Sequence, residues 1–170
     1  MWNEIWWKTV WIIWFWNIWK KVYERLKWFW VKKFLIFDPF LEKNKIEENI
    51  FCKKVETKEE IFSESEILSF HIPLLDSTKN FLWEKNFLNL KKNILIINLS
   101  RWWIIDEKFL IKFLKNNPDA KFFWDVWEEE NFWWEPKKKF FELENCLITP
   151  HIWAMTKEAE EKMHYFWELK

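Results

Sequence analysis

The sequence predicts an α/β fold built on a doubly wound parallel sheet, and three observations lead to this prediction. Apolar runs of strand length alternate with segments whose apolar residues recur at helical spacing. The runs are continuously apolar, which is typical of parallel strands covered on both faces. The 170 residues suit one domain and contain no internal repeat or low-complexity linker. We therefore expect a single domain over residues 1–170, with right-handed crossovers.

The first half of the chain contains three predicted strands and two predicted helices. Ile18, Val22 and Leu26 recur every fourth residue and form the apolar stripe of the first helix. Thr57 opens the second helix, and Glu60 completes a capping box. In chain order we expect a strand at Thr9–Trp14, a helix at Asn17–Trp28, a strand at Phe34–Phe37, a helix at Thr57–Ser65 and a strand at Ile67–Phe70.

The second half continues the alternation of strands and helices. Asp106 is placed as the N-cap of a helix whose apolar face holds Phe109, Leu110, Phe113 and Leu114. In chain order we expect a partly helical segment at Thr78–Leu90, a strand at Ile94–Leu99, a helix at Asp106–Asn116, a strand at Ala120–Val126, a long connection at Glu128–Glu144, a strand at Cys146–Thr149 and a helix at Thr156–Leu169.

Composition and charge disfavour several classes of protein. Lys and Arg total 27 and Asp and Glu total 27, so the net charge is zero and we expect no nucleic-acid partner. No apolar run approaches the ~20 residues of a membrane-spanning helix, and the first residues lack a targeting pattern, so we expect no membrane partner. Cys52 and Cys146 lie far apart and lack metal-ligand spacing, which indicates a reducing, cytoplasmic setting without a bound metal.

The absence of glycine is the most unusual feature of the chain, which has no Gly and 18 Trp. Trp14, Trp16 and Trp19 have the spacing of G-x-G-x-x-G, after a strand and at the opening of a helix, where that dinucleotide-binding motif belongs. Asp38 ends the next strand, where an acidic residue hydrogen-bonds the ribose 2′-OH of a dinucleotide. The same replacement recurs in the segments S-R-W-W and H-I-W-A.

With Trp read as Gly, nearly the whole chain resembles the NAD-binding domain of the D-isomer-specific 2-hydroxyacid dehydrogenases, the family of D-3-phosphoglycerate and D-lactate dehydrogenases. The resemblance implies a single nucleotide-binding domain of the Rossmann type with NAD as its cofactor. Six ordered segments carry the resemblance, namely Lys8–Trp19, Phe37–Phe40, His71–Leu74, Asn98–Trp103, Asp125–Glu130 and Thr149–Ala154.

We interpret most of the Trp residues as glycines in the molecule that the cell makes. The codon UGA encodes glycine in some bacterial genetic codes, and translation with a code that assigns it to tryptophan would give Trp at those positions. The high content of Lys, Ile, Asn and Phe fits an AT-rich genome, as expected for such bacteria. Trp127 stands where the family often has an aromatic residue, and Trp124, Trp133 and Trp134 stay undecided. The rival interpretation is a deliberate Gly-to-Trp substitution, whose indoles would fill the phosphate pocket and prevent NAD binding.

The resemblance assigns the chemistry to three residues, Arg101, Glu130 and His151. The planar guanidinium of Arg101 would hold the carboxylate of a 2-oxo acid. His151 would transfer the proton, and Glu130 would orient its imidazole and favour the protonated form. Without the resemblance, Arg101 is an ordinary surface residue in an ion pair, and the run Glu128–Glu130 is a solvated loop.

The resemblance also carries over a set of cofactor-binding positions. Asp38 favours NAD over NADP because its charge would repel a 2′-phosphate, although taken alone it is also a common turn residue before Pro39. His71 is expected to line the cofactor groove rather than to transfer a proton. The expected cofactor-binding residues are Trp14, Trp16, Asn17, Ile18, Trp19, Asp38, His71, Pro73, Leu99, Ser100, Asp125 and Trp153.

Two functions stay open at this point. The resemblance implies an NAD-dependent oxidoreductase that transfers a hydride between nicotinamide and a D-2-hydroxy or 2-oxo acid. The alternative is a non-catalytic NAD-sensing module of the same fold. Family members carry a substrate-binding domain ahead of this one, and Met1 stands close to the first strand, so we expect a fragment that is inactive alone. For the full-length protein the resemblance implies a homodimer.

Overall fold

The computed structural model describes residues 4–13, 17–38, 52–126, 139–152 and 155–161, with the backbone alone at 17–19. The elements in chain order are β1 (Thr9–Ile13), α1 (Asn17–Leu26), a 3₁₀ helix (Lys27–Phe29), β2 (Lys33–Phe37), β3 (Cys52–Lys54), α2 (Lys58–Glu64), β4 (Ile67–Phe70), α3 (Glu84–Phe87), β5 (Leu95–Asn98), a 3₁₀ helix (Trp102–Ile104), α4 (Glu107–Asn116), β6 (Lys121–Trp124) and β7 (Cys146–Ile148).

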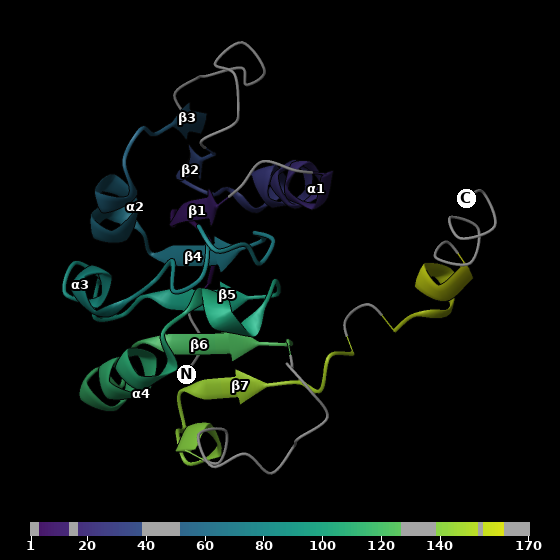
Figure 1. Ribbon diagram of the computed structural model, residues 1–170. Coiled ribbons are helices and arrows are strands. Elements are labelled where there is room, and N and C mark those ends of the chain that lie inside the picture. Colours follow the sequence, from purple (N-terminus) through teal and green to yellow (C-terminus); the bar gives the residue numbers. More distant parts are fainter. Residues whose placement is uncertain (1–3, 14–16, 39–51, 127–138, 153–154, 162–170) are drawn as a thin grey trace.

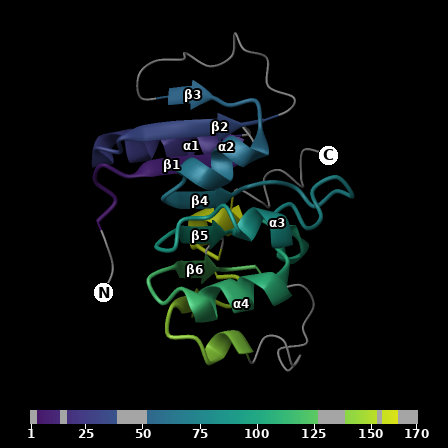
Figure 2. The ribbon, with the colours of Figure 1, turned by 90° about the vertical axis from the view of Figure 1, so that its left-hand side faces the viewer.

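The described strands form one parallel sheet in the order β3-β2-β1-β4-β5-β6-β7. The sheet is seen edge-on in Figure 1, with α1 on one face and α2, α3 and α4 on the other. Figure 2 looks onto the face that α2, α3 and α4 cover. The strand order reverses between β1 and β4, so the predicted doubly wound Rossmann-type sheet is confirmed.

Two predicted helix starts are confirmed in atomic detail. The hydroxyl of Thr57 accepts a hydrogen bond from the backbone N–H of Glu60, and the carboxyl of Asp106 accepts one from that of Phe109. Each cap satisfies a backbone donor that a helix leaves without an internal partner. These side chains therefore set where α2 and α4 begin.

Other elements differ from the prediction. The edge strand β3 was not predicted, because it is three residues long and only Cys52 among them is buried. The segment predicted to be partly helical at Thr78–Leu90 contains the single turn of α3. The predicted connection before β7 includes a helical turn at 139–141, and residues 157–161 are helical within the predicted final helix, whose remainder lies outside the described residues.

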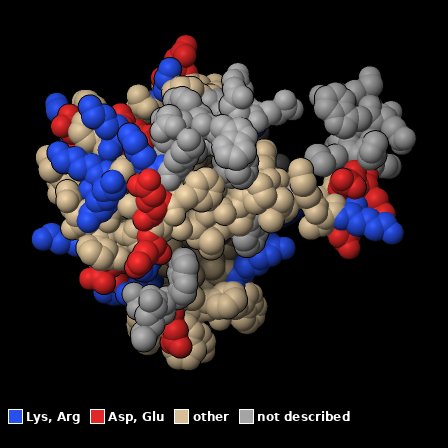
Figure 3. Space-filling view, turned by 90° about the horizontal axis from the view of Figure 1, so that it is seen from below, with Lys and Arg blue, Asp and Glu red and all other residues tan. Residues whose placement is uncertain are grey.

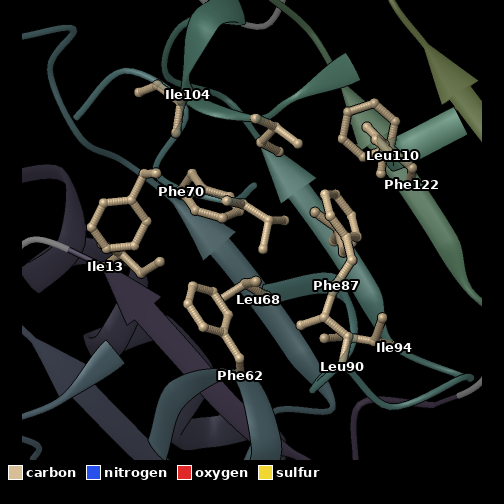
Figure 4. Close-up of a cluster of buried hydrophobic side chains, with 14 of the residues drawn as sticks. Ile13, Phe62, Leu68, Phe70, Phe87, Leu90, Ile94, Ile104, Leu110 and Phe122 are labelled. Atoms are coloured by element: carbon tan, nitrogen blue, oxygen red, sulfur yellow. The ribbon is translucent and has the colours of Figure 1, made fainter. Parts of the chain in front are cut away.

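Two apolar layers hold the described elements together. The layer under α2, α3 and α4 contains most of the buried aromatic side chains, and part of it is drawn in Figure 4. The smaller layer under α1 is built from Val10, Ile12, Phe34, Ile36 and neighbouring side chains. Because burying each large apolar side chain contributes ~1.5–3 kcal/mol, the larger layer dominates the stability of the sheet.

Charged side chains lie outside these layers. The three lysines of α4, Lys108, Lys112 and Lys115, are exposed. Lys and Arg side chains gather on the left of Figure 3, the side of the sheet on which α2, α3 and α4 lie, with Asp and Glu beside them. Mixed charge of this kind is typical of a solvated helix face. None of the helices in the described ranges is both long and apolar enough to cross a membrane.

Candidate active site

The candidate site lies at the carboxyl edge of the sheet. Because all described strands are parallel, the residues that follow β2, β4, β5, β6 and β7 emerge at one edge. In open α/β sheets this edge binds ligands, at the point where the strand order reverses. The predicted site residues of the described part follow these strands, namely Asp38, His71, Pro73, Leu99, Ser100, Arg101, Asp125 and His151.

The connection between β1 and α1 is short, as in a dinucleotide-binding site. Only residues 14–16 separate the end of β1 from the start of α1, so the helix N-terminus lies directly beyond the strand. The backbones of Asn17, Ile18 and Trp19 form the first turn of α1. Trp14 and Trp16 lie outside the described residues.

Asp38 lies just beyond the end of β2. It follows Phe37, which pairs with Ile13 at the end of β1, and the residue is 3% exposed. A buried carboxyl group next to the end of β1 fits the ribose of a dinucleotide, because it can accept hydrogen bonds from the ribose hydroxyls. The strand order and Asp38 therefore fit NAD.

His71, after β4, carries a neutral imidazole at physiological pH. Its Nε2 lies 2.9 Å from the hydroxyl oxygen of Ser69. Burial lowers the pKa of His71 to about 4, because the charged form loses its hydration. A histidine of this kind is a poor proton donor at pH 7.

Thr78, which the sequence did not single out, holds the loop that follows His71. Its hydroxyl donates to the carbonyl oxygen of Pro73 at 2.7 Å and accepts from the backbone N–H of Leu75 at 2.8 Å. The side chain is 1% exposed. The exposed Pro73 is thereby fixed in the loop that follows β4.

Arg101 is carried by a loop that Asn98 braces from within. The side-chain amide of Asn98 donates to the carbonyl oxygen of Arg101 at 2.9 Å, and its oxygen accepts from the backbone N–H and the hydroxyl of Ser100. The guanidinium of Arg101 donates to the carbonyl oxygen of Ser100 at 2.7 Å. Arg101 and Leu99 are exposed, so the guanidinium is open to a ligand.

His151 stands in a turn that Asp125 holds. The Oδ1 atom of Asp125 accepts hydrogen bonds from the hydroxyl of Thr149 at 2.6 Å and from the backbone N–H of Ile152 at 3.0 Å. Asp125 is 4% exposed, whereas His151 is exposed. The imidazole is therefore open to solvent while the turn beneath it is anchored in the sheet.

The loops that carry Arg101 and His151 flank β6. The backbone N–H of Asp125 donates to the carbonyl oxygen of Asn98 at 3.4 Å, which links the two braces. Neighbouring strands lie ~4.8 Å apart, so the ends of β5 and β7, on either side of β6, lie ~10 Å apart. Glu130 and Trp153 lie outside the described residues.

Metal and thiol chemistry find no support in the described part of the chain. No group of three or more His, Cys, Asp or Glu side chains gathers there in a way that would hold a metal ion. Burial raises the pKa of the Cys146 thiol to about 12, so the nucleophilic thiolate is scarce at neutral pH. The polar groups at the carboxyl edge are instead suited to bind anions and to transfer protons.

A family model for the NAD-binding domain of D-isomer-specific 2-hydroxyacid dehydrogenases matches residues 1–152. The chain belongs to this family. The glyoxylate reductase of Thermococcus litoralis is 35% identical over 156 residues, which are 92% of this chain and 45% of that protein. The D-3-phosphoglycerate dehydrogenase of Methanocaldococcus jannaschii is 30% identical over 159 residues, 93% of this chain and 29% of that protein.

A solved structure gives the same result for the fold. The NAD-complexed D-isomer-specific 2-hydroxyacid dehydrogenase of Lactobacillus delbrueckii ssp. bulgaricus matches with a TM-score of 0.83 and 25% identity, over 96% of this chain and 51% of that one. The chain therefore spans about half the length of that structure. Its fold is that of the NAD-binding domain, and NAD is its cofactor.

Proposed function

We propose that the chain is the NAD-binding half of an oxidoreductase that interconverts D-2-hydroxy acids and 2-oxo acids. The observation that carries this proposal is the pair of exposed side chains Arg101 and His151, on braced loops that flank the end of β6. An exposed guanidinium and an exposed imidazole provide an anion ligand and a proton donor, the two groups that reduction of a 2-oxo acid needs.

Three residues of the chain have distinct roles in the proposed reaction. Arg101 binds the substrate carboxylate through two of its N–H groups, which orients the neighbouring carbonyl. His151 donates a proton to the carbonyl oxygen during reduction and removes it in the reverse direction. Glu130 orients the imidazole of His151. When bound, NAD supplies or accepts the hydride at its nicotinamide ring.

The cofactor lies along the carboxyl edge in this proposal. The backbone at Trp14, Trp16, Asn17, Ile18 and Trp19 binds the pyrophosphate at the N-terminus of α1. Asp38 binds the adenosine ribose and favours NAD over NADP. The remaining contacts come from residues after β4 to β7, namely His71, Pro73, Leu99, Ser100, Asp125 and Trp153.

The assay uses the full-length protein purified from its native host, with NADH and a panel of 2-oxo acids that includes glyoxylate, pyruvate and hydroxypyruvate. We expect NADH oxidation with at least one of them. A His151→Asn variant should bind NADH as tightly as the wild type and lose most turnover, and Arg101→Lys should raise KM for the oxo acid. Tight NADH binding without reduction of any 2-oxo acid would support the sensing module instead.

We also propose that most of the Trp residues are glycines in the native protein. Among the described residues, positive φ occurs at Trp7, Trp30, Asn80 and His151. Asn tolerates this conformation and Gly prefers it, whereas a Cβ with a bulky side chain makes it costly. Intact mass of the protein from its native host tests the proposal, and a mass that fits Trp at every position would refute it.

The cellular setting is a further part of the proposal. Neither Cys52 nor Cys146 is part of a disulfide bond. Cysteines outside disulfides are typical of a reducing compartment such as the cytoplasm. We propose a cytoplasmic homodimer without nucleic-acid or membrane partners, which size-exclusion chromatography with light scattering and cell fractionation would test.

A further inference from the structure

The backbone of His151 adopts a left-handed conformation. Its φ is 55°, a region that residues with a Cβ avoid. Such a conformation persists only where the surroundings hold it, and it is often found at functional sites. The contacts on either side of His151 therefore determine how rigidly its backbone and imidazole are held in place.

One carboxyl oxygen holds both sides of this turn. Asp125 Oδ1 accepts from the hydroxyl of Thr149, two residues before His151, and from the backbone N–H of Ile152, one residue after it. The N–H of His151 itself donates to the carbonyl oxygen of Thr149 at 3.0 Å. Thr149 is also fixed to β6, since its N–H donates to the carbonyl oxygen of Trp124 at 2.9 Å.

We propose that Thr149 is a positioning residue for His151, which it holds in the strained turn through the carboxyl group of Asp125. This inference rests on the proposed function, in which His151 transfers the proton. At 2.6 Å the bond from Thr149 to Asp125 is the shorter of the two, and it lies half-buried just after the end of β6. Hydrogen bonds to carboxyl groups are stronger than bonds between neutral partners.

Removing the hydroxyl should affect turnover more than binding. In Thr149→Val the shape of the side chain is kept, but Asp125 loses the hydroxyl donor and its hold on the turn is weakened, while the bond from the N–H of Ile152 is retained. The imidazole then spends less time where it can reach the substrate oxygen. Arg101 and the first turn of α1 lie on other segments, and Asp125 keeps its bond from the N–H of Ile152, so binding of the oxo acid and of NADH should change little.

The matched pair for the experiment is Thr149→Val and Thr149→Ser in the full-length protein, because Ser retains the hydroxyl. We expect kcat to fall about tenfold in the valine variant, which corresponds to ~1.4 kcal/mol, with KM and the Kd of NADH within about twofold of wild type. The serine variant should recover most of kcat. If the valine variant proves unstable, Thr149→Ala replaces it with the same expectation.

Amide hydrogen exchange gives a readout that does not depend on activity. The N–H groups of His151 and Ile152 should exchange faster in Thr149→Val than in wild type or in Thr149→Ser, because the turn opens more often. Unchanged exchange and unchanged kcat in the valine variant would overturn the inference, and so would equal losses of kcat and NADH affinity. A wild-type protein that reduces no 2-oxo acid defeats the proposed function, while the exchange data still decide whether Thr149 holds the turn.

Discussion

Trp30 allows a test of the glycine interpretation that needs neither cofactor nor substrate. It caps the 3₁₀ helix after α1 with φ 55° and ψ 38°, and its side chain is 70% exposed. A residue with a Cβ loses ~1–2 kcal/mol in this conformation, whereas glycine loses ~0.5–1 kcal/mol of extra chain entropy on folding. Because the exposed indole contributes little burial, Trp30→Gly should raise the free energy of unfolding by about 0.5–1 kcal/mol.

Trp30→Ala is the matched control, since it removes the same indole and keeps the Cβ. The carbonyl oxygen of residue 30, which accepts from the N–H of Trp7 at 3.1 Å, is present in both variants. Urea unfolding followed by circular dichroism should place Trp30→Gly above both Trp30→Ala and the unchanged chain, with a gain in Tm of roughly 2 °C. A glycine variant no more stable than the alanine variant would refute the reasoning.

Three further predictions concern the described part of the chain. The free energy of unfolding should fall as pH is lowered from 6.5 toward about 4, because folding favours the neutral form of His71. The urea midpoint of the wild type should therefore be lower at pH 5 than at pH 7, and this difference should shrink in His71→Gln. A wild-type midpoint that does not change with pH would contradict the prediction. Asp106→Ala should lower the free energy of unfolding by ~1 kcal/mol through loss of the α4 cap, and an unchanged urea midpoint would show that the cap is dispensable. Asp38→Ser in the full-length protein should reduce the preference for NADH over NADPH, as measured by the ratio of their Kd values, and an unaltered ratio would remove Asp38 from the ribose site.

The sequence predicts most of the fold because its central strands are largely buried and therefore apolar. β1, β2, β4, β5 and β6 each appear as a continuous apolar run, and local capping residues mark where α2 and α4 begin. β3 escapes prediction because an edge strand is covered incompletely, and Lys53 and Lys54 interrupt any apolar run. Apolar runs thus mark the strands, including the edge strand β7, and β3 is missed because it has no such run.

The candidate site is predictable only in part, for a related reason. Arg101 and His151 can be located because they follow apolar strands, and parallel strands end at one edge. The contacts that hold them have no periodicity: Asp125 and Thr149 are 24 residues apart in the chain yet share a hydrogen bond. Asn98 and Thr78 are likewise buried polar residues whose purpose is evident only from their partners.

The Trp residues differ in what a single substitution reveals about them. Trp11 is fully buried in β1, and its indole N–H has no hydrogen-bond partner among the described residues, which costs ~1–3 kcal/mol. Trp11→Gly would remove that cost but leave a cavity that destabilises the fold by ~3–5 kcal/mol. Because the cavity has the larger effect, the variant should be less stable whether Trp or Gly is the native residue. Trp102, stacked on Trp124 at 3.8 Å between ring centroids, presents the same difficulty. Only exposed left-handed positions such as Trp7 and Trp30 separate backbone preference from packing, and for the buried positions the mass of the native protein is the decisive measurement.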